Sequence, residues 1–384
     1  MKKTVHLFIF ADALGWELVQ HYGILKSVAP YQRKCETLFG YSATCDPTIL
    51  TGTSPHEHGH FSFFVKAPPA QSPFRCMRWL GWLPERIAGY HKLRNRLSRI
   101  FAKVKGYTGY FQLYSVPFRC LPWLDYTEKK DIYEPNGIIG GQESIFEAWK
   151  RSGKIWHRSN WRSGDADNYA EAEALIQAGE VELLYLFTAG LDATMHRYGP
   201  WSPQTKAAFN TFDVKVENLM QLAEQNYQNV RLSIFSDHGM TEVQENSDLR
   251  TRCEKLPLRY GPDYVAVWDS TMARFWFHND CAKQQITQLL ESAPEGRILD
   301  ADTLEKWRCN FPHQTYGELF YLLHPGTLFV PSFLNLSTLP GMHGYAPEHK
   351  DSAACWLSNF ETPQPVERLE DIYPVMYHAA QSKD

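Results

Sequence analysis

Three short, almost uninterrupted apolar segments stand out along the chain, at residues 5–11, 181–188 and 230–236. An apolar run of this length between polar residues indicates a strand that is buried on both faces. Between the last two segments, apolar residues recur every three or four positions, which predicts an amphipathic helix; they are Phe209, Phe212, Val216, Leu219 and Ala223. Further helices are expected at 169–178 and 143–151. Strands that alternate with helices predict an α/β fold, doubly wound, with a mainly parallel sheet and helices on both faces.

Acidic and histidine residues follow each predicted strand. Asp12 comes directly after the first strand, Asp192 shortly after the second, and Asp237-His238 directly after the third. The carboxyl ends of parallel strands meet at one edge of a sheet, and ligands bind at that edge. One such aspartate has an ordinary alternative role as a helix N-cap, which would suit Asp12. Three of them together favour a binding site.

Two segments interrupt the alternation of strands and helices, at about 61–136 and about 242–339. The second contains strand-like runs at 264–268, 272–277 and 317–323 and a helix near 282–291. We expect both to be insertions that form a cap or wall on a single catalytic domain spanning residues 1–384.

The first insertion is basic and aromatic. Residues 66–105 hold ten Lys or Arg against one acidic residue, Glu85. One interpretation is a solvated face packed on the sheet; the other is a phosphate-binding lid or a helix at a membrane surface. Apolar residues recur at near-helical spacing among the basic ones, as in helices that lie on anionic lipid: Trp82, Leu83, Ile87, Leu93, Leu97, Ile100, Phe101 and Val104. Peripheral membrane contact through 66–105 is therefore one hypothesis.

Residues 40–60 contain the candidate nucleophile and read GYSATCDPTILTGTSPHEHGH. Ser42 stands nine residues before Thr51. This arrangement resembles the nucleophile helix of the alkaline phosphatase superfamily, in which a Ser or Thr precedes a Thr-Gly pair by this interval. The start of a helix suits an alkoxide, because free backbone N–H groups and the helix dipole favour negative charge there. Thr44 is the alternative nucleophile, and Asp46 and Asn160 are candidates for substrate contact.

Three further motifs extend the resemblance from residue 5 to about residue 347. Asp192-Ala-Thr-Met-His196 resembles the D-x-x-x-H segment of the type I phosphodiesterase/nucleotide pyrophosphatase branch. The S-D-H-G-M block at 236–240 and the G-M-H-G-Y block at 341–345 resemble two other segments of that branch. Each motif alone is weak, but together they stand in the family's order along the chain.

The resemblance implies a site with two divalent metal ions. Asp192 and His196, four residues apart, would share one side of a helical turn and bind one ion together with His343. The second ion would take Asp12, Asp237, His238 and the Ser42 alkoxide as its ligands. Aspartate oxygen and histidine nitrogen suit zinc, with manganese or iron as alternatives. Two such ions can hold the attacking and leaving oxygens of an in-line displacement.

The reaction expected from this site is hydrolysis of a phosphoric ester through a covalent phosphoseryl intermediate. The motifs favour a phosphodiesterase or nucleotide pyrophosphatase that acts on a small phosphate ester or a lipid- or glycan-linked substrate. A phosphomonoesterase and a phosphotransferase acting on a glycan or lipid are the alternatives. A sulfatase is disfavoured, because the residues after Ser42 lack the C/S-x-P-x-R motif. A non-catalytic binding protein should lack metal ligands, whereas all six are present.

Charge and cysteine content indicate which partners and which cellular compartment to expect. A net charge of −4 gives no reason to expect a nucleic-acid polymer as partner. The eight cysteines form no C-x-x-C pair, which favours free buried thiols in a reducing cytosol. The apolar run at 5–11 is short for a signal peptide, and no run is long enough to span a membrane. We therefore expect a cytoplasmic protein, with membrane association confined to its surface.

Overall fold

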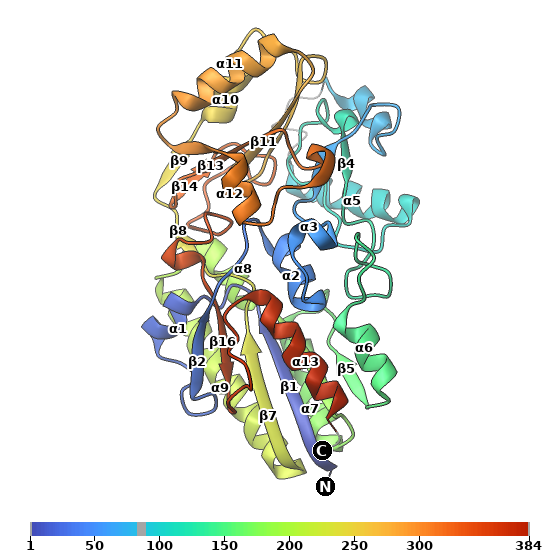
Figure 1. Cartoon of the computed structure of the whole chain (residues 1–384), viewed down its shortest axis with the longest axis vertical. Coiled ribbons are helices and arrows are strands. Elements are labelled where there is room, and N and C mark those ends of the chain that lie inside the picture. The colour runs from blue at the N-terminus through green and yellow to red at the C-terminus, as the bar shows by residue number, and fades with distance from the viewer. Residues whose placement is uncertain (1, 83–89, 383–384) are drawn as a thin grey trace.

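A six-stranded sheet forms the lower half of the computed structural model, which describes residues 2–82 and 90–382 (Figure 1). The strands lie in the order β2 (Tyr31–Cys35), β16 (Ala354–Ser358), β7 (Tyr227–Phe235), β1 (Lys2–Ala11), β6 (Leu183–Thr188) and β5 (Trp156–Arg158). β1 pairs in parallel with β6 and β7, and β5 pairs in parallel with β6. β16 runs antiparallel to both of its neighbours. The prediction of a mainly parallel α/β sheet is confirmed.

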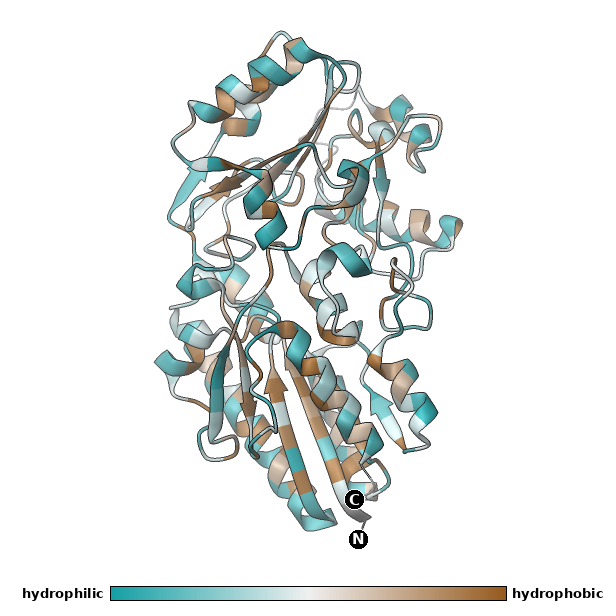
Figure 2. Ribbon diagram, in the orientation of Figure 1, coloured by the Kyte–Doolittle hydropathy of each residue, from teal (hydrophilic) through white to brown (hydrophobic). Residues whose placement is uncertain are grey.

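The central strand β1 is buried on both faces, and its side chains alternate between two hydrophobic cores. Val5, Leu7 and Ile9 pack into a core shared with α1 (Trp16–Tyr22), α7 (Asp165–Ala178), α8 (Gly190–Tyr198) and α9 (Pro203–Asn226). Phe8 and Phe10 face the opposite core, shared with α2 (Ser42–Thr51), α6 (Ile145–Ser152) and α13 (Ile372–Gln381). Figure 2 shows the hydrophobic residues that run along β1. Helices therefore cover both faces of the sheet, as expected.

The second insertion forms a separate antiparallel sheet in the upper half of Figure 1. Its strands lie in the order β10 (Tyr264–Trp268), β11 (Met272–Phe277), β13 (Leu319–Leu323) and β12 (Gly296–Leu299). The accompanying helices are α10 (Leu249–Glu254), α11 (Asp280–Glu291) and α12 (Ala301–Lys306). Short strand pairs join the insertion to the neighbouring loops: β9 (Glu245–Ser247) with β14 (Thr327–Phe329), and β8 (Thr241–Glu242) with β15 (Gly341–Met342).

The first insertion packs against this second sheet. It contains the hairpin of β3 (Phe64–Lys66) and β4 (Leu124–Tyr126), the helix α5 (His91–Lys105) and the 3-10 turns η1 (Arg75–Leu80) and η2 (Leu121–Trp123). Phe74, Phe101 and Tyr126 lie in one hydrophobic core with Trp268 and Phe275 of the second insertion. The two insertions, more than a hundred residues apart in sequence, thus build one cap.

The predicted helix within the first insertion is present as α5, although Leu83 and Ile87 lie outside the described residues. Phe101 is buried in the cap core and Leu97 packs against it. Ile100 and Val104 are exposed instead, at 53% and 77%. One side of α5 therefore packs on the protein, while another side leaves apolar residues in solvent.

All eight cysteines lie in the described part of the chain and are free thiols, as predicted. Six are buried, whereas Cys76 and Cys281 are exposed, so the expectation of burial is wrong for these two. Among the described residues, no helix combines the length and the apolar character needed to span a bilayer.

Candidate metal centre and nucleophile

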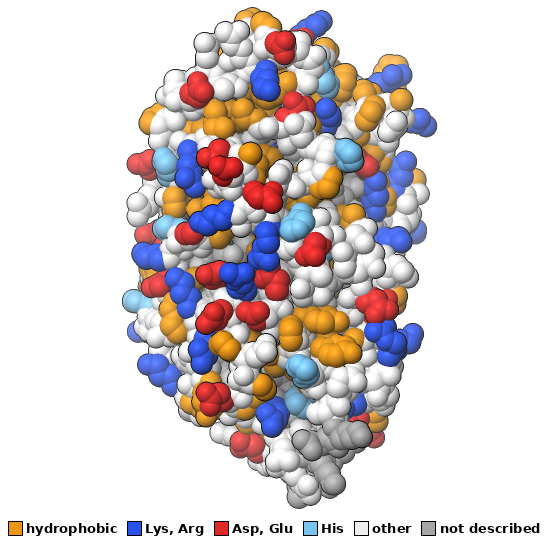
Figure 3. All heavy atoms as spheres, in the orientation of Figure 1, with side chains coloured by type: hydrophobic (Ala, Val, Ile, Leu, Met, Phe, Trp, Pro, Cys, Tyr) orange, Lys and Arg blue, Asp and Glu red, His pale blue; other side chains and the backbone are white. Residues whose placement is uncertain are grey.

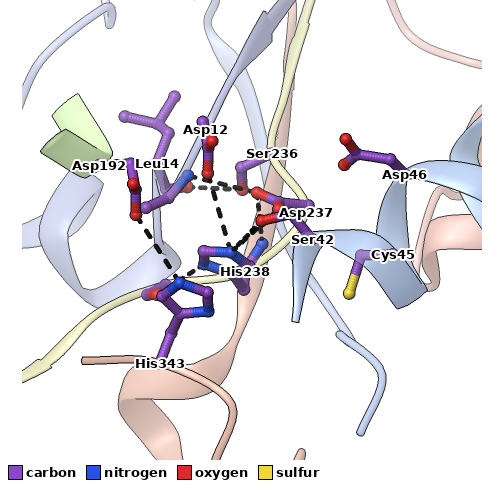
Figure 4. A network of polar contacts seen from close by, with 12 residues as sticks. Asp12, Leu14, Ser42, Cys45, Asp46, Asp192, Ser236, Asp237, His238 and His343 are labelled. Carbon is purple, nitrogen blue, oxygen red and sulfur yellow. Dashed lines mark hydrogen bonds and ion pairs between the residues drawn. The ribbon is translucent and has the colours of Figure 1, made fainter. Parts of the chain in front are cut away.

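The seven predicted site residues meet at the carboxyl edge of the six-stranded sheet. The register of β1 aligns Ala11 with Thr188 and Phe10 with Phe235, so three neighbouring strands end side by side. Asp12, Asp237 and His238 follow β1 and β7 directly, while Asp192 and His196 lie on α8 just after β6. His343 follows β15, and Ser42 is the first residue of α2. Figure 4 shows six of these side chains, all but His196, turned toward one another.

Asp192, His196 and His343 form the first group, with one potential ligand atom of each lying within 4.8 Å of the others. Asp192 Oδ1 lies 3.2 Å from His196 Nε2 and 3.9 Å from His343 Nε2. His196 Nδ1 is 2.9 Å from the carbonyl of Gly341. A hydrogen bond from Nδ1–H to that carbonyl leaves the Nε2 lone pair facing the aspartate, as in histidines that bind metals.

Asp12, Asp237 and His238 form the second group on the same criterion. His238 Nε2 lies 2.9 Å from Asp237 Oδ2 and 3.8 Å from Asp12 Oδ1. His238 Nδ1 is 2.9 Å from the carbonyl of Gly239, which orients this ring in the same way as His196. The rings of His238 and His343 stack with centroids 3.7 Å apart, so the two groups are adjacent.

Burial and neighbouring charges shift the pKa values of residues in both groups. Burial raises the pKa of Asp12 well above its ordinary value, and the neighbouring Asp237 and Asp192 raise it further. Burial lowers the pKa of His343 well below its usual range, and His238 adds to that shift. Within the described residues, Asp12 Oδ1, Asp192 Oδ1 and Asp237 Oδ2 are buried without a hydrogen-bond partner.

Buried carboxylate oxygens without donors are costly unless a cation compensates them. Two histidines with Nε2 directed at these oxygens complete a donor set of the kind that divalent metals take in proteins. The residues of both groups therefore fit divalent cations. Sequence reasoning placed the same residues in the same two groups.

Ser42 and Thr44 occupy different environments on α2. Ser42 Oγ lies 3.1 Å from His238 Nε2 and borders a cavity. Thr44 is fully buried, and its hydroxyl donates a hydrogen bond of 2.7 Å to the carbonyl of Phe61. Of the two hydroxyls, that of Ser42 lies beside the candidate metal ligands and the cavity, whereas that of Thr44 is turned into the protein.

The cavity beside Ser42 has a volume of about 510 Å³ and extends from the candidate metal ligands to the first insertion. One wall is aromatic and is made by Phe63, Tyr110, Tyr114 and Trp161. Besides the candidate metal ligands, the carboxyl groups that line the cavity are those of Asp46, Glu128 and Asp131. No lysine or arginine stands among the described residues that line the cavity.

The three wall carboxylates differ in their partners. Asp131 is paired with Arg162 at 2.8 Å. Glu128 is 7% exposed, and its Oε1 has no hydrogen-bond partner within the described residues. The pKa of Asp46 is raised well above its ordinary value by burial, then by Asp237 and Glu128. Asp46 was a candidate for substrate contact from sequence and does line the cavity, whereas Asn160 does not.

Sequence reasoning missed Glu128 and the tyrosines of the aromatic wall. They come from the first insertion, which carries no motif that marks them. The available signal was compositional, namely the unusual density of aromatic residues in that insertion.

With this geometry in place, comparison with known proteins identifies the class. The chain belongs to the type I phosphodiesterase/nucleotide pyrophosphatase family, whose model matches residues 40–346. The resemblance inferred from the motifs is thereby confirmed. Membership supports a phosphoester hydrolase.

Individual relatives are distant in sequence. Human ectonucleotide pyrophosphatase/phosphodiesterase family member 7 is 28% identical over 120 residues, which cover 28% of this chain and 25% of that protein. The match thus spans about a quarter of the curated relative's length.

Solved structures are similar over almost the whole chain. Murine ectonucleotide pyrophosphatase/phosphodiesterase 5 is 15% identical with a TM-score of 0.68, covering 99% of this chain and 95% of that one. Phosphonoacetate hydrolase from Sinorhizobium meliloti 1021, in complex with phosphonoformate, is 12% identical with a TM-score of 0.66, covering 99% and 96%. At these identities the likeness establishes the fold.

Proposed function

We propose that this protein is a metal-dependent phosphodiesterase in which Ser42 attacks phosphorus and forms a covalent phosphoseryl intermediate. The observation that carries the proposal is the position of Ser42. It begins α2, borders the cavity, and has its Oγ 3.1 Å from His238 within two adjoining groups of metal-ligand type.

In the first step, Ser42 loses its proton to solvent and its Oγ forms a bond to phosphorus while the bond to the leaving alcohol breaks. The alcohol departs with a proton from water. In the second step, water displaces the phosphoryl group from Ser42 Oγ and restores the hydroxyl. Ser42 is the first residue of α2, where the helix dipole favours the negative charge that develops at Oγ. The overall products are an alcohol and a phosphomonoester.

Divalent cations, when bound, would lower the pKa of the Ser42 hydroxyl and offset charge on the phosphoryl oxygens. Asp192, His196 and His343 would hold one cation. The other would be held by Asp12, Asp237 and His238 together with Ser42. The mixed Asp and His donor set favours zinc, and manganese or iron remain alternatives because the same ligand types accept them.

The charge of the cavity favours a diester over a monoester. A monoester carries one more negative charge than a diester and is normally gripped by a cationic side chain. The described lining residues include the carboxyl groups of Asp46, Glu128 and Asp131, of which only Asp131 is paired with an arginine, and they include no Lys or Arg. Like charges in a poorly hydrated cavity repel one another strongly. A diester with an uncharged or cationic leaving group suits this cavity better.

The alternatives remain a phosphomonoesterase and a phosphotransferase that uses a glycan or lipid acceptor. Nucleotide esters also belong among the substrates tested. A solved structure of the murine relative, in an inactive form, contains AMP, and the aromatic residues Phe63 and Tyr110 line the cavity of this chain.

Steady-state kinetics on bis(p-nitrophenyl) phosphate, p-nitrophenyl phosphate and a nucleotide p-nitrophenyl ester test the proposal. We expect kcat/KM for one of the diesters to exceed that for the monoester by at least about tenfold. Ser42→Ala should abolish turnover while elemental analysis still finds bound metal. Thr44→Val, the matched control, should keep turnover if it folds. Full activity in Ser42→Ala would refute the nucleophile assignment, and a preference for the monoester would refute the diesterase.

A further inference from the structure

The helix α5 presents an exposed surface that the proposed reaction does not use. Exposed large hydrophobic side chains are more concentrated in one short part of the first insertion than anywhere else in the described residues. Six lie there: Trp79, Trp82, Tyr90, Leu93, Ile100 and Val104. None of the α5 side chains that the structure describes lines the cavity beside Ser42. This surface therefore has no role in the catalytic site.

The apolar residues of α5 that are exposed form a ridge. Leu93, Ile100 and Val104 are separated by seven and four residues, so at 100° per residue they lie within about 40° of one another around the helix axis. The buried side of the helix, which includes Arg94 and Ser98, faces the cap. The ridge borders the packing face, since Leu97 packs on the cap core only about 20° from Val104 around the axis, but the three ridge side chains themselves remain in solvent.

Four basic residues, Lys92, Arg96, Arg99 and Lys103, follow the ridge on its solvent side and are all exposed. Within the described part of the chain, none of these four side chains forms an ion pair with a carboxylate, and their neighbours along the sequence are basic or uncharged. The stretches 75–82 and 90–105 contain no Asp or Glu, although the whole chain has a net charge of −4. Figure 3 shows blue Lys and Arg side chains along the upper right edge, where Figure 1 places α5.

We propose that α5 docks the protein onto the surface of anionic lipid membranes. The ridge of Leu93, Ile100 and Val104 enters the headgroup region, and the four basic side chains contact lipid phosphates. An aliphatic ridge beside an all-basic strip is the pattern of helices that lie in the plane of a bilayer surface. A nucleic acid would contact the basic strip but would gain nothing from burying the aliphatic ridge.

The test is co-sedimentation of the full-length chain with vesicles of phosphatidylcholine alone or with about 30% phosphatidylserine, a fraction that produces a substantial negative surface potential. A charge variant carries Lys92→Gln, Arg96→Gln, Arg99→Gln and Lys103→Gln. A ridge variant carries Leu93→Ser, Ile100→Ser and Val104→Ser. A control variant removes the same number of positive charges from the exposed surface of the sheet half, through Lys26→Gln, Arg33→Gln, Lys34→Gln and Lys206→Gln.

The unmodified chain should bind the anionic vesicles and not the neutral ones, and added salt should release it. The charge variant should bind at least about tenfold more weakly, since each basic residue near an anionic surface contributes several-fold to binding. The ridge variant should also bind at least about tenfold more weakly, because binding scales with the buried apolar area as well as with charge. The control variant should bind like the unmodified chain. Thermal melting verifies that each variant is folded, and turnover of a soluble diester should be unchanged.

Three results would overturn the proposal. One is negligible binding of the unmodified chain to anionic vesicles at low salt. Another is equal loss of binding in the control variant, which would indicate a non-specific charge effect. The third is retention of binding by a folded ridge variant, as expected if the basic strip serves a nucleic acid instead. Vesicle binding is measured without turnover, so failure here is distinct from failure of the proposed phosphodiesterase.

Discussion

Replacement of Arg274 by methionine should loosen the cap that walls the cavity. The guanidinium of Arg274 is fully buried and lies 3.0 Å from Asp269 Oδ2, which is itself almost fully buried. It also donates hydrogen bonds to the carbonyl of Tyr316 at 2.9 Å, to Ser62 Oγ at 2.7 Å and to the carbonyl of Phe64 at 3.0 Å. One side chain thereby joins β11 to the first insertion.

The loss in the free energy of unfolding can be estimated from the buried groups that lose their hydrogen-bond partner. Methionine fills a similar volume but donates no hydrogen bond, so Asp269 would keep a buried charge with only the Ser62 hydroxyl, at 3.3 Å, as a donor. Breaking a buried pair by removing one partner costs about 3–5 kcal/mol. Two carbonyls also lose their donor, at about 1 kcal/mol each. We expect the free energy of unfolding to fall by at least about 4 kcal/mol, a large part of the roughly 5–15 kcal/mol typical of a domain.

Urea unfolding followed by tryptophan fluorescence measures this loss. A second variant that combines Arg274→Met with Asp269→Asn should recover part of it, since the unpaired charge is then absent. Arg151→Met is the matched control, because Arg151 pairs with Glu143 on the surface, where each side chain is 58% exposed. No measurable change is expected there. A fall of less than about 1 kcal/mol in Arg274→Met would refute the assignment of this pair as a structural clamp.

The remaining predictions concern the metal groups, the cavity wall and acid stability. His343→Ala should release bound metal from one site in preference to the other, which elemental analysis during stepwise chelation would show; simultaneous loss of all metal would contradict two separable sites. Glu128→Gln should raise kcat/KM for p-nitrophenyl phosphate several-fold relative to the diester, because it removes a negative charge from the cavity; an unchanged ratio would count against charge-based selection. Burial, followed by Arg231 and Lys154, lowers the pKa of His6 to about 4. As the pH falls, His6 binds a proton in the unfolded chain before it does so in the folded one. The free energy of unfolding should therefore fall by up to about 3 kcal/mol between about pH 6.5 and about pH 4. His6→Gln should flatten that part of the stability–pH profile measured by urea unfolding. A profile identical to that of the unmodified protein would contradict the lowered pKa of His6.

The strands that carry the site could be predicted because their signal is local. The runs at 5–11, 181–188 and 230–236 are buried on both faces and read as continuous apolar segments. The residues after them then follow from the geometry of parallel strands. The antiparallel pairing of β16 with β7 and β2 could not be predicted in this way. A strand's partner can lie far away in the sequence, and the local apolar pattern does not specify which strand it is.

The cavity wall illustrates the same limit at the level of side chains. Glu128 lies just after β4 and reaches the cavity only because the first insertion folds back against the second sheet. Their shared core, with Phe74 and Phe101 against Trp268, is a long-range contact with no periodic signature. The two groups of candidate metal ligands could be predicted as neighbours because metal-ligand chemistry restricts residue type and spacing, whereas a cavity wall accepts many residue types.

The first insertion places α5 and the aromatic wall of the cavity on one continuous segment. Asn95 Oδ1 of α5 accepts a hydrogen bond of 2.8 Å from Gln112, and Ser98 Oγ accepts one of 2.9 Å from the backbone N–H of Leu113. The segment bound in this way carries Tyr110 and Tyr114, whose rings line the cavity. If α5 lies on a membrane, these bonds hold the aromatic wall at a fixed position relative to the bilayer. A lipid-linked diester would then approach Ser42 along that wall, whereas a soluble diester needs no membrane, so surface binding and intrinsic turnover are separable properties of this chain.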